Sequence, residues 1–135
     1  MILDMIRVPD SLMKRYREQY EDKCAISQDV VSRLDHGDEV YVDTGTTTAH
    51  IFDLLSQADK DVSVTTHSAF ALTNFGGRNK LVMTGGQLDK RYGGFYPESR
   101  EKCYEVLGPL SVKKIILATA AITYQIGRAS CRERV

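Results

Sequence analysis

The sequence predicts an α/β fold, with a Rossmann-like parallel sheet and flanking helices in a single domain. Short apolar strand-like runs alternate along the chain with helix-like runs, which is the pattern of crossover units. The turn 43–48 joins the first strand to its helix and is rich in glycine and threonine. Each later strand also ends in small or polar residues. The carboxyl edge of the sheet is therefore the expected position of a ligand site.

The first elements of the chain are predicted to be helices. Pro9-Asp10-Ser11 has the residue types of a helix start. Ile26, Val30 and Leu34 then recur every four residues, which predicts a helix with one buried stripe. Gly37 follows this helix and is suited to a left-handed C-cap position.

The rest of the chain alternates between strands and helices that stop at glycine or proline. The predicted strands are 40–42, 62–65, 81–84 and 114–118, and the predicted helices are 49–55, 68–75 and 98–107. The segment 92–97 is rich in aromatic residues and glycine, and it is predicted to be a loop. Strands alternating with helices imply a parallel sheet covered on both faces.

The turn after the first strand has the local sequence of an anion-binding site. The first N–H groups of a helix have no intrahelical partner, and the helix dipole places partial positive charge there. Gly45 permits a close backbone approach to a ligand, and Thr46, Thr47 and Thr48 add hydroxyl donors. The alternative is a simple helix cap, because threonine and aspartate cap helices for the same reason. Asp43 likewise has two open roles, capping the turn or contacting a sugar hydroxyl.

The ends of the later strands supply further polar groups. Thr66 and Ser68 follow the second strand, and Gly85 and Gly86 follow the third. Because the carboxyl ends of parallel strands meet at one edge, we expect these groups to join the turn in one pocket for a phosphorylated ligand. The candidate ligand- and phosphate-binding residues are Asp43, Gly45, Thr46, Thr47, Thr48, Thr66, Ser68, Gly85 and Gly86.

Composition narrows the possible functions. The 135 residues are 42% hydrophobic and 27% charged, which is typical of a globular domain. The formal net charge is zero, and no basic cluster favours direct nucleic-acid binding. No secretory signal and no apolar run of about 20 residues is present, so no membrane contact is expected. Three widely spaced cysteines are typical of reduced thiols in a cytoplasmic protein. No Cys/His pair has ligand spacing, so we expect no metal and no cofactor.

The segment 126–135 departs from the pattern of the rest of the chain, because it has no periodic apolar face. In one reading frame it resembles the translation of a common sequencing adapter, whose preceding bases would complete the codon of Gln125. We therefore expect native sequence to end near Tyr124 and residues 125–135 to be a non-native tail. A genuine basic tail is the alternative. Without this segment the chain has a small acidic excess.

Several motifs, in order along the chain, resemble the effector-sensing domain of DeoR/GlpR-type transcriptional repressors. Val42–Thr48 resembles the D-x-G-T-T-T signature of that family, and Glu21–Ile26 resembles its E-K-x-x-I-A lead-in. Val64–Ser68 resembles its V-T-N-S step, with His67 where an asparagine is usual, and Thr84–Leu88 resembles its G-G-x-x segment. The run into the fourth strand is also similar, at Leu107-Gly108-Pro109 and Lys114-Ile115-Ile116-Leu117.

The resemblance implies a domain that binds a phosphorylated sugar effector. The family's sensing domain is related in fold to ribose-5-phosphate isomerase and CoA-transferase-like enzymes, and it acts on DNA through an N-terminal winged helix-turn-helix. Only a charged linker or helix remnant, residues 1–20, precedes the resemblance, so DNA contact is expected only through a module absent from this chain. The family domain also continues past a fourth strand. Residues 21–124 are therefore expected to be a sensing domain truncated at its C-terminus, for which a homo-oligomer is allowed. The alternative is a chain too incomplete to fold alone, whose unpaired sheet edges would self-associate.

The related isomerases also raise the alternative of a sugar-phosphate isomerase-like enzyme. These enzymes use acids just after the equivalent of the fourth strand, and proton transfer between sugar carbons needs such a group. Here the segment 118–123 contains no Asp, Glu, His or Lys, which favours binding without catalysis. His67 is a minor ligand candidate, and Lys90-Arg91 is expected to be a solvated pair. The aromatic loop 92–97 is equally consistent with a mobile lid and with a packed loop.

Overall fold

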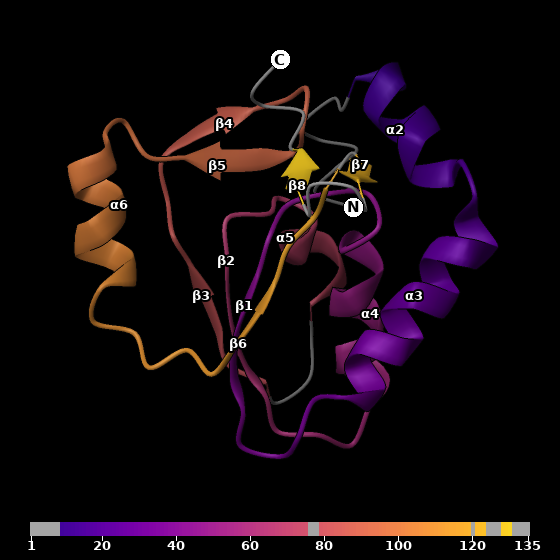
Figure 1. Cartoon of the computed structure of the whole chain (residues 1–135), viewed down its shortest axis with the longest axis horizontal. Helices are drawn as coiled ribbons and strands as arrows, with labels where there is room; N and C mark the ends of the chain where they lie inside the picture. The colour runs from indigo at the N-terminus through magenta and orange to yellow at the C-terminus, as the bar shows by residue number, and fades with distance from the viewer. Residues whose placement is uncertain (1–8, 76–78, 120, 124–127, 131–135) are drawn as a thin grey trace.

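The computed structural model describes residues 9–75, 79–119, 121–123 and 128–130, and it confirms the predicted α/β class (Figure 1). A four-stranded parallel sheet runs in the order β3-β2-β1-β6. Its strands are β1 (Glu39–Val42), β2 (Ser63–Thr66), β3 (Leu81–Met83) and β6 (Lys114–Ile116). The chain moves outward from β1 to β3 and then returns to place β6 on the other side of β1. The point between β1 and β6 is therefore the topological switch point, where open α/β sheets hold their ligands.

Helices lie on both sides of this sheet. Figure 1 shows α3, α4 and α5 on one side and α6 on the other. Their bounds are α2 (Asp10–Arg17), α3 (Tyr20–Ser32), α4 (Ala49–Gln57), α5 (Ala71–Asn74) and α6 (Arg100–Leu107). The charged amino-terminal stretch thus forms α2 and the start of α3, which meet at Gln19.

The hydrophobic core lies between the central strands and α4. Val42, Phe52 and Leu55 have no exposed surface, and Val40 and Val64 are 1% exposed. Because alternate residues of a strand point to opposite faces, the valines of β1 both face this core. Burial of these side chains against α4 fixes the start of α4 directly behind the end of β1.

The predicted apolar stripe of the second helix is wrong at Ile26, which is 54% exposed. The buried residues of α3 are Ser27 and Val31 instead. Ser27 Oγ donates a hydrogen bond of 2.9 Å to the carbonyl oxygen of Thr47. A small polar residue that satisfies a backbone acceptor therefore takes the inner position, and the helix is rotated by about one residue from the expected phase.

The second face of the sheet is covered less completely than expected. Helix α6 has no fully buried residue, and on β6 and just beyond it Ile115 and Leu117 are 65% and 66% exposed. Within the described residues, this face of the sheet is therefore open at Ile115.

The segment 92–97, predicted to be a loop, is part of a β-hairpin that the sequence did not indicate. Strands β4 (Gln87–Asp89) and β5 (Gly94–Tyr96) pair antiparallel. The hairpin is packed against the end of β2, because Phe95 N donates to His67 O and Ala69 N donates to Gly93 O, each at 2.7 Å. Of the two interpretations of the aromatic segment, the structure has the packed one.

A second antiparallel pair lies near the C-terminus. Strand β7 (Ala121–Thr123) pairs with β8 (Arg128–Ser130). The second of these strands falls in the segment expected to be a non-native tail, for which no strand was predicted. Residues 1–8 of the amino-terminal remnant, and 124–127 and 131–135 at the other end, lie outside the described residues. The domain limits drawn from the sequence, including the tail, stay predictions.

Candidate functional site

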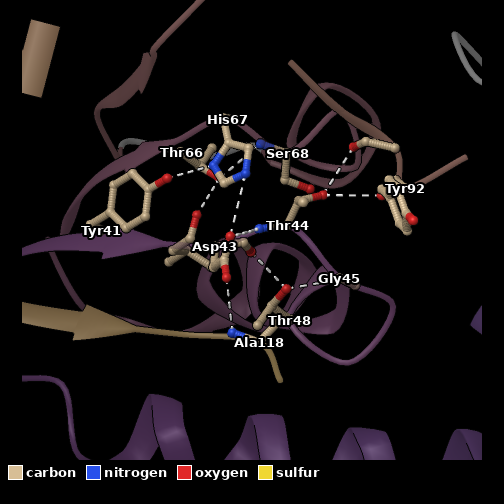
Figure 2. Close-up of polar contacts among 12 residues, drawn as sticks. Tyr41, Asp43, Thr44, Gly45, Thr48, Thr66, His67, Ser68, Tyr92 and Ala118 are labelled. Atoms are coloured by element: carbon tan, nitrogen blue, oxygen red, sulfur yellow. Dashed lines mark hydrogen bonds and ion pairs between the residues drawn. The ribbon is translucent and has the colours of Figure 1, made fainter. Parts of the chain in front are cut away.

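Asp43 is the first residue after β1 and connects three strand ends at the switch point (Figure 2). Its carboxylate accepts hydrogen bonds from Thr44 N at 2.8 Å and from Ala118 N at 3.1 Å. Its Oδ1 lies 3.3 Å from Nε2 of His67, which follows β2. The side chain is 19% exposed, so these contacts are largely shielded from water. One carboxylate thereby ties the end of β1 to those of β2 and β6.

His67 extends these polar contacts toward Tyr41. Its Nδ1 is hydrogen-bonded to the Tyr41 hydroxyl, and its ring is stacked on that of Tyr41 with centroids 5.9 Å apart. An ionised carboxylate can only accept, so contact with Asp43 favours the tautomer with hydrogen on Nε2, and Nδ1 then accepts from the tyrosine. Figure 2 shows the imidazole of His67 between the phenol of Tyr41 and the carboxylate of Asp43. The arrangement presents a carboxylate, an imidazole and a phenol to one side of the sheet edge.

A cleft of about 220 Å³ opens at this edge. It lies between the strand ends, the β4–β5 hairpin and α6. Its polar side chains are Tyr41, Asp43, His67 and Thr84, and Thr84 Oγ1 is buried without a hydrogen-bond partner within the described residues. Apolar walls surround them, as in most small-molecule sites. The remaining lining residues are Phe95, Tyr96, Pro97, Cys103, Val106 and Leu107.

The turn 44–48 is held in place from several sides. Thr48 Oγ1 donates to the carbonyl oxygens of Asp43 and Gly45, at 2.8 and 3.2 Å. Thr44 Oγ1 donates to the backbone of the hairpin, at 3.1 Å from Gly93 O. Lys23 of α3 donates from Nζ to Thr46 Oγ1 at 2.9 Å. The turn is thus preorganised by its own hydroxyls and by a lysine from another helix.

Backbone donors remain available in this turn. The N–H groups of 45–48 have no hydrogen-bond acceptor within the part of the chain that the structure describes. Gly45 is at a point of close approach, because a Cβ there would lie 2.9 Å from the Cβ of Ala118. Only glycine therefore fits between the turn and the chain that leaves β6. These amides, the dipole of α4 and Lys23 together form a positive environment.

The structure does not bring all nine predicted site residues to one cavity. Asp43 lines the cleft, whereas Gly45, Thr46, Thr47 and Thr48 form the adjacent turn. The other four make contacts within the protein. Contact of any of the nine with a ligand stays a prediction.

Thr66 and Ser68 are fully buried under the turn. Thr66 Oγ1 donates to Val42 O at 2.6 Å and accepts from Ser68 N at 3.0 Å. Gly85 and Gly86 are exposed, with φ of +74° and +112°, and they lead into the hairpin. A Cβ on Gly86 would lie 2.3 Å from Tyr96 O, so its close contact is with the backbone of β5.

Several residues of the site were not found from the sequence. Tyr41 alternates with the buried valines of β1, and this period of two was a signal that its side chain faces the opposite side. Lys23 gave no signal beyond its place in the lead-in motif. Thr84 and the α6 residues of the cleft depend on how the hairpin and α6 pack, which a local pattern does not show. Lys90 and Arg91 are exposed, as expected.

A buried histidine lies behind the turn. His50, in the first turn of α4, is 4% exposed, and its Nε2 has no hydrogen-bond partner within the described residues. Burial lowers the pKa of His50, and the positive charge of Lys23 lowers it further. Its ring centroid lies 4.7 Å from that of Tyr16 and 5.0 Å from that of Tyr20. The imidazole is therefore held neutral within an aromatic cluster.

The described residues contain neither a membrane-crossing helix nor a metal-binding cluster. None of their helices has the length and apolar character that crossing a bilayer requires. Nor do they contain a group of three or more His, Cys, Asp or Glu residues arranged to hold a metal ion.

A parallel sheet with a polar cleft at its switch point is the arrangement in which open α/β domains hold small ligands. Comparison with known families is more specific. The family model described as "DeoR C terminal sensor domain" matches residues 18–133. The chain belongs to this family of transcription-regulator sensor domains, and the resemblance inferred from its motifs is confirmed.

Similarity to a bacterial transcriptional regulator supports the same family assignment. The chain is 34% identical over 65 residues to a Bacillus subtilis (strain 168) protein named "Uncharacterized HTH-type transcriptional regulator FruR". The aligned part is 48% of this chain and only 26% of the length of that protein. The family match also extends into 125–135, whose non-native origin stays a prediction.

Proposed function

We propose that this chain is the effector-binding part of a cytoplasmic, sugar-responsive transcriptional regulator and that its effector is a phosphorylated sugar. The phosphate binds the turn 45–48 and Lys23, and sugar hydroxyls face Asp43 and His67. DNA is contacted by a winged helix-turn-helix module outside this chain. Family membership and similarity to a protein named as an HTH-type regulator support the regulatory role.

The observation that carries the ligand assignment is the set of donors at the start of α4. The amides of 45–48 have no acceptor among the described residues, and Lys23 Nζ is 2.9 Å from the hydroxyl of Thr46. Backbone amides at a helix N-terminus and a lysine ammonium are the groups that proteins use for phosphate. The adjoining cleft adds a carboxylate, which accepts from sugar hydroxyls, and the unpartnered hydroxyl of Thr84.

Thermal shift with matched pairs of ligands tests this function. Pentose and hexose phosphates are compared with the same sugars lacking phosphate. A phosphorylated ligand at about 100 times its Kd stabilises the folded protein by about 2.7 kcal/mol, which raises the Tm measurably. The free sugars are expected to give no shift. Equal shifts with both members of each pair would contradict phosphate recognition.

Two variants locate the phosphate. Lys23→Met removes the ammonium and Thr46→Val removes the hydroxyl while keeping the side-chain shape. Loss of one charge-assisted hydrogen bond of about 1.5–3 kcal/mol weakens binding by at least about tenfold. Lys80→Met is the matched control, because Lys80 is an exposed lysine at the amino end of β3, away from the turn. Unchanged affinity in both test variants would remove the turn from the site.

A second candidate function is a sugar-phosphate isomerase-like activity. The observation that favours it is the Asp43–His67 contact at the cleft, since a carboxylate and an imidazole are the usual groups for proton transfer. The acid-free segment 118–123 opposes it. NMR detection of ketose–aldose conversion, with the ligands that produce thermal shifts, distinguishes the two. Turnover supports the enzyme, and binding without turnover supports the sensor.

A further inference from the structure

The first turn of α4 carries a histidine that the proposed function does not use. The residues from Ala49 to Phe52 are all buried, and apart from His50 they are apolar. The imidazole lies against Tyr16 of α2 and Tyr20 of α3, with ring centroids 4.7 and 5.0 Å away. A phenylalanine would fill the same space without a polar atom. Packing alone therefore does not account for an imidazole at this position.

One nitrogen of this imidazole is unsatisfied. Nε2 of His50 is buried and has no hydrogen-bond partner among the described residues. A neutral imidazole has one donor and one acceptor nitrogen, so the role that Nε2 takes is unmet in either tautomer. A buried polar group without a partner costs free energy and calls for an explanation. A nitrogen that can take up a proton offers one, because it can change the charge of its surroundings.

The groups around the imidazole keep it neutral when no ligand is bound. Burial lowers the pKa of His50, the positive charge of Lys23 in α3 lowers it further, and the negative charge of Asp53 in α4 acts in the opposite direction. The other titratable groups that contact the ring, Tyr16 and Tyr20, are phenols, which are ordinarily uncharged near neutral pH. A further negative charge close to the ring would favour the protonated form.

His50 is close to the turn proposed to bind phosphate. The turn ends at Thr48, the N-cap of α4, and His50 N donates to Thr47 O at 3.4 Å. Side chains of a helix lean toward its N-terminus, which for α4 is the side of the turn. Lys23, whose charge acts on the imidazole, also donates to Thr46 Oγ1. The imidazole and the turn therefore lie within reach of the same ammonium, and burial limits the screening between them.

We propose that His50 links anion binding to proton uptake: a dianionic group at the turn 45–48 draws a proton from solvent onto His50, and protonated His50 raises the affinity of the turn for the anion. The inference rests on the proposed function, because it assumes that the effector's anionic group occupies this turn. Linkage makes the two effects equal in size. Anion binding is therefore strongest in mildly acidic solution and weakens as the pH rises and the imidazole loses its proton.

Sulfate binding at a series of pH values tests the linkage. Sulfate keeps its charge through this range, whereas a phosphate group titrates near pH 6, with a pKa of about 6. Sulfate affinity is expected to rise roughly tenfold from about pH 8 to about pH 5.5, the order of magnitude for opposite charges about 10 Å apart inside a protein.

Two variants assign this pH dependence. His50→Phe keeps a ring beside the two tyrosines and is expected to remove the rise in affinity. His36→Gln is the control at an exposed histidine outside the site, and its amide can still accept the hydrogen bond from Asp61 N. This control is expected to keep the rise. A rise that persists in full in His50→Phe overturns the inference.

NMR of the three histidine rings in the unmodified chain gives a second measurement that needs no variant. Sulfate is expected to shift the amide signals of 45–48 and to move the titration midpoint of His50 to higher pH, while the midpoint of His36 stays in place. A response of the turn with an unchanged His50 midpoint overturns the inference and leaves the proposed function standing. No response of the turn to sulfate overturns both.

Discussion

Replacement of Asp43 by asparagine tests how strongly this residue holds the strand ends together. The carboxylate accepts hydrogen bonds from Thr44 N at 2.8 Å and from Ala118 N at 3.1 Å, and its Oδ1 lies 3.3 Å from His67 Nε2. The amide of Asn has one oxygen and one NH2 group. If the oxygen keeps the contacts to Thr44 and His67, the NH2 group faces the N–H of Ala118, and two donors then oppose each other.

The expected loss of stability follows from these contacts. A shielded donor left without an acceptor costs about 1–3 kcal/mol, and loss of charge weakens the contact with His67 as well. Partial exposure of Asp43 lets water compensate in part, so we expect Asp43→Asn to lower the free energy of unfolding by about 2 kcal/mol. For a domain of this size that is a fall in Tm of roughly 6–10 °C. Calorimetry or a dye-based melt without ligand measures it.

Asp53→Asn is the matched control for this experiment. Asp53 is exposed on α4 and accepts one hydrogen bond, from Gln57 of the same helix, at 3.1 Å. Substitution there is expected to change stability by less than about 0.5 kcal/mol. A Tm of Asp43→Asn as close to wild type as that of the control would refute the structural role given to Asp43.

Three further predictions concern other parts of the fold. Gly86→Ala places a Cβ 2.3 Å from Tyr96 O and is expected to cost at least about 2 kcal/mol in urea unfolding, whereas Gly85→Ala, with no atom within 4 Å of its Cβ, costs about 1 kcal/mol for the positive φ alone. Burial lowers the pKa of His50, so the unfolded state takes up this proton first and wild-type stability falls as the pH drops below about 6.5; His50→Phe is expected to flatten that part of the pH profile. Hydrogen bonding to Lys114 lowers the pKa of Asp38, so its contribution is present above the unfolded pKa of about 3.9 and is lost as the pH falls through the lower folded value; Lys114→Met is expected to reduce the acid sensitivity of the urea midpoint.

Local sequence patterns were sufficient to predict the strands of the parallel sheet. Each predicted strand lies close to an observed one, because the apolar runs of buried parallel strands are bounded by turn residues. The hairpin was missed because β4 and β5 are only three residues each and follow two glycines with positive φ. Ile26 was misplaced because the inner position of α3 is decided by a hydrogen bond from Ser27 to the turn, which lies outside the helix.

The candidate site was predictable only where its residues are neighbours in the sequence. The turn 43–48 is a local motif, and its sequence indicated both its position and its unpaired amides. The contacts from Lys23, His67 and Ala118 join elements far apart in the chain, and no periodicity shows which lysine or histidine reaches a given turn. Thr66 and Ser68 are at the predicted strand end, but their hydroxyls bond to the backbone under the turn.

The position of Asp43 bears on the kind of effector that we propose for this domain. Its carbonyl oxygen accepts from Thr48 in the turn, while its carboxylate borders the cleft, so one residue joins the two halves of the candidate site. A ligand confined to the cleft leaves the amides of 45–48 without an anion, and free phosphate leaves the hydroxyl of Thr84 without a partner. Shielded polar groups without partners cost free energy. A molecule that carries both an anionic group and hydroxyls would satisfy both halves, which supports the proposal of a phosphorylated sugar over a sugar or phosphate alone.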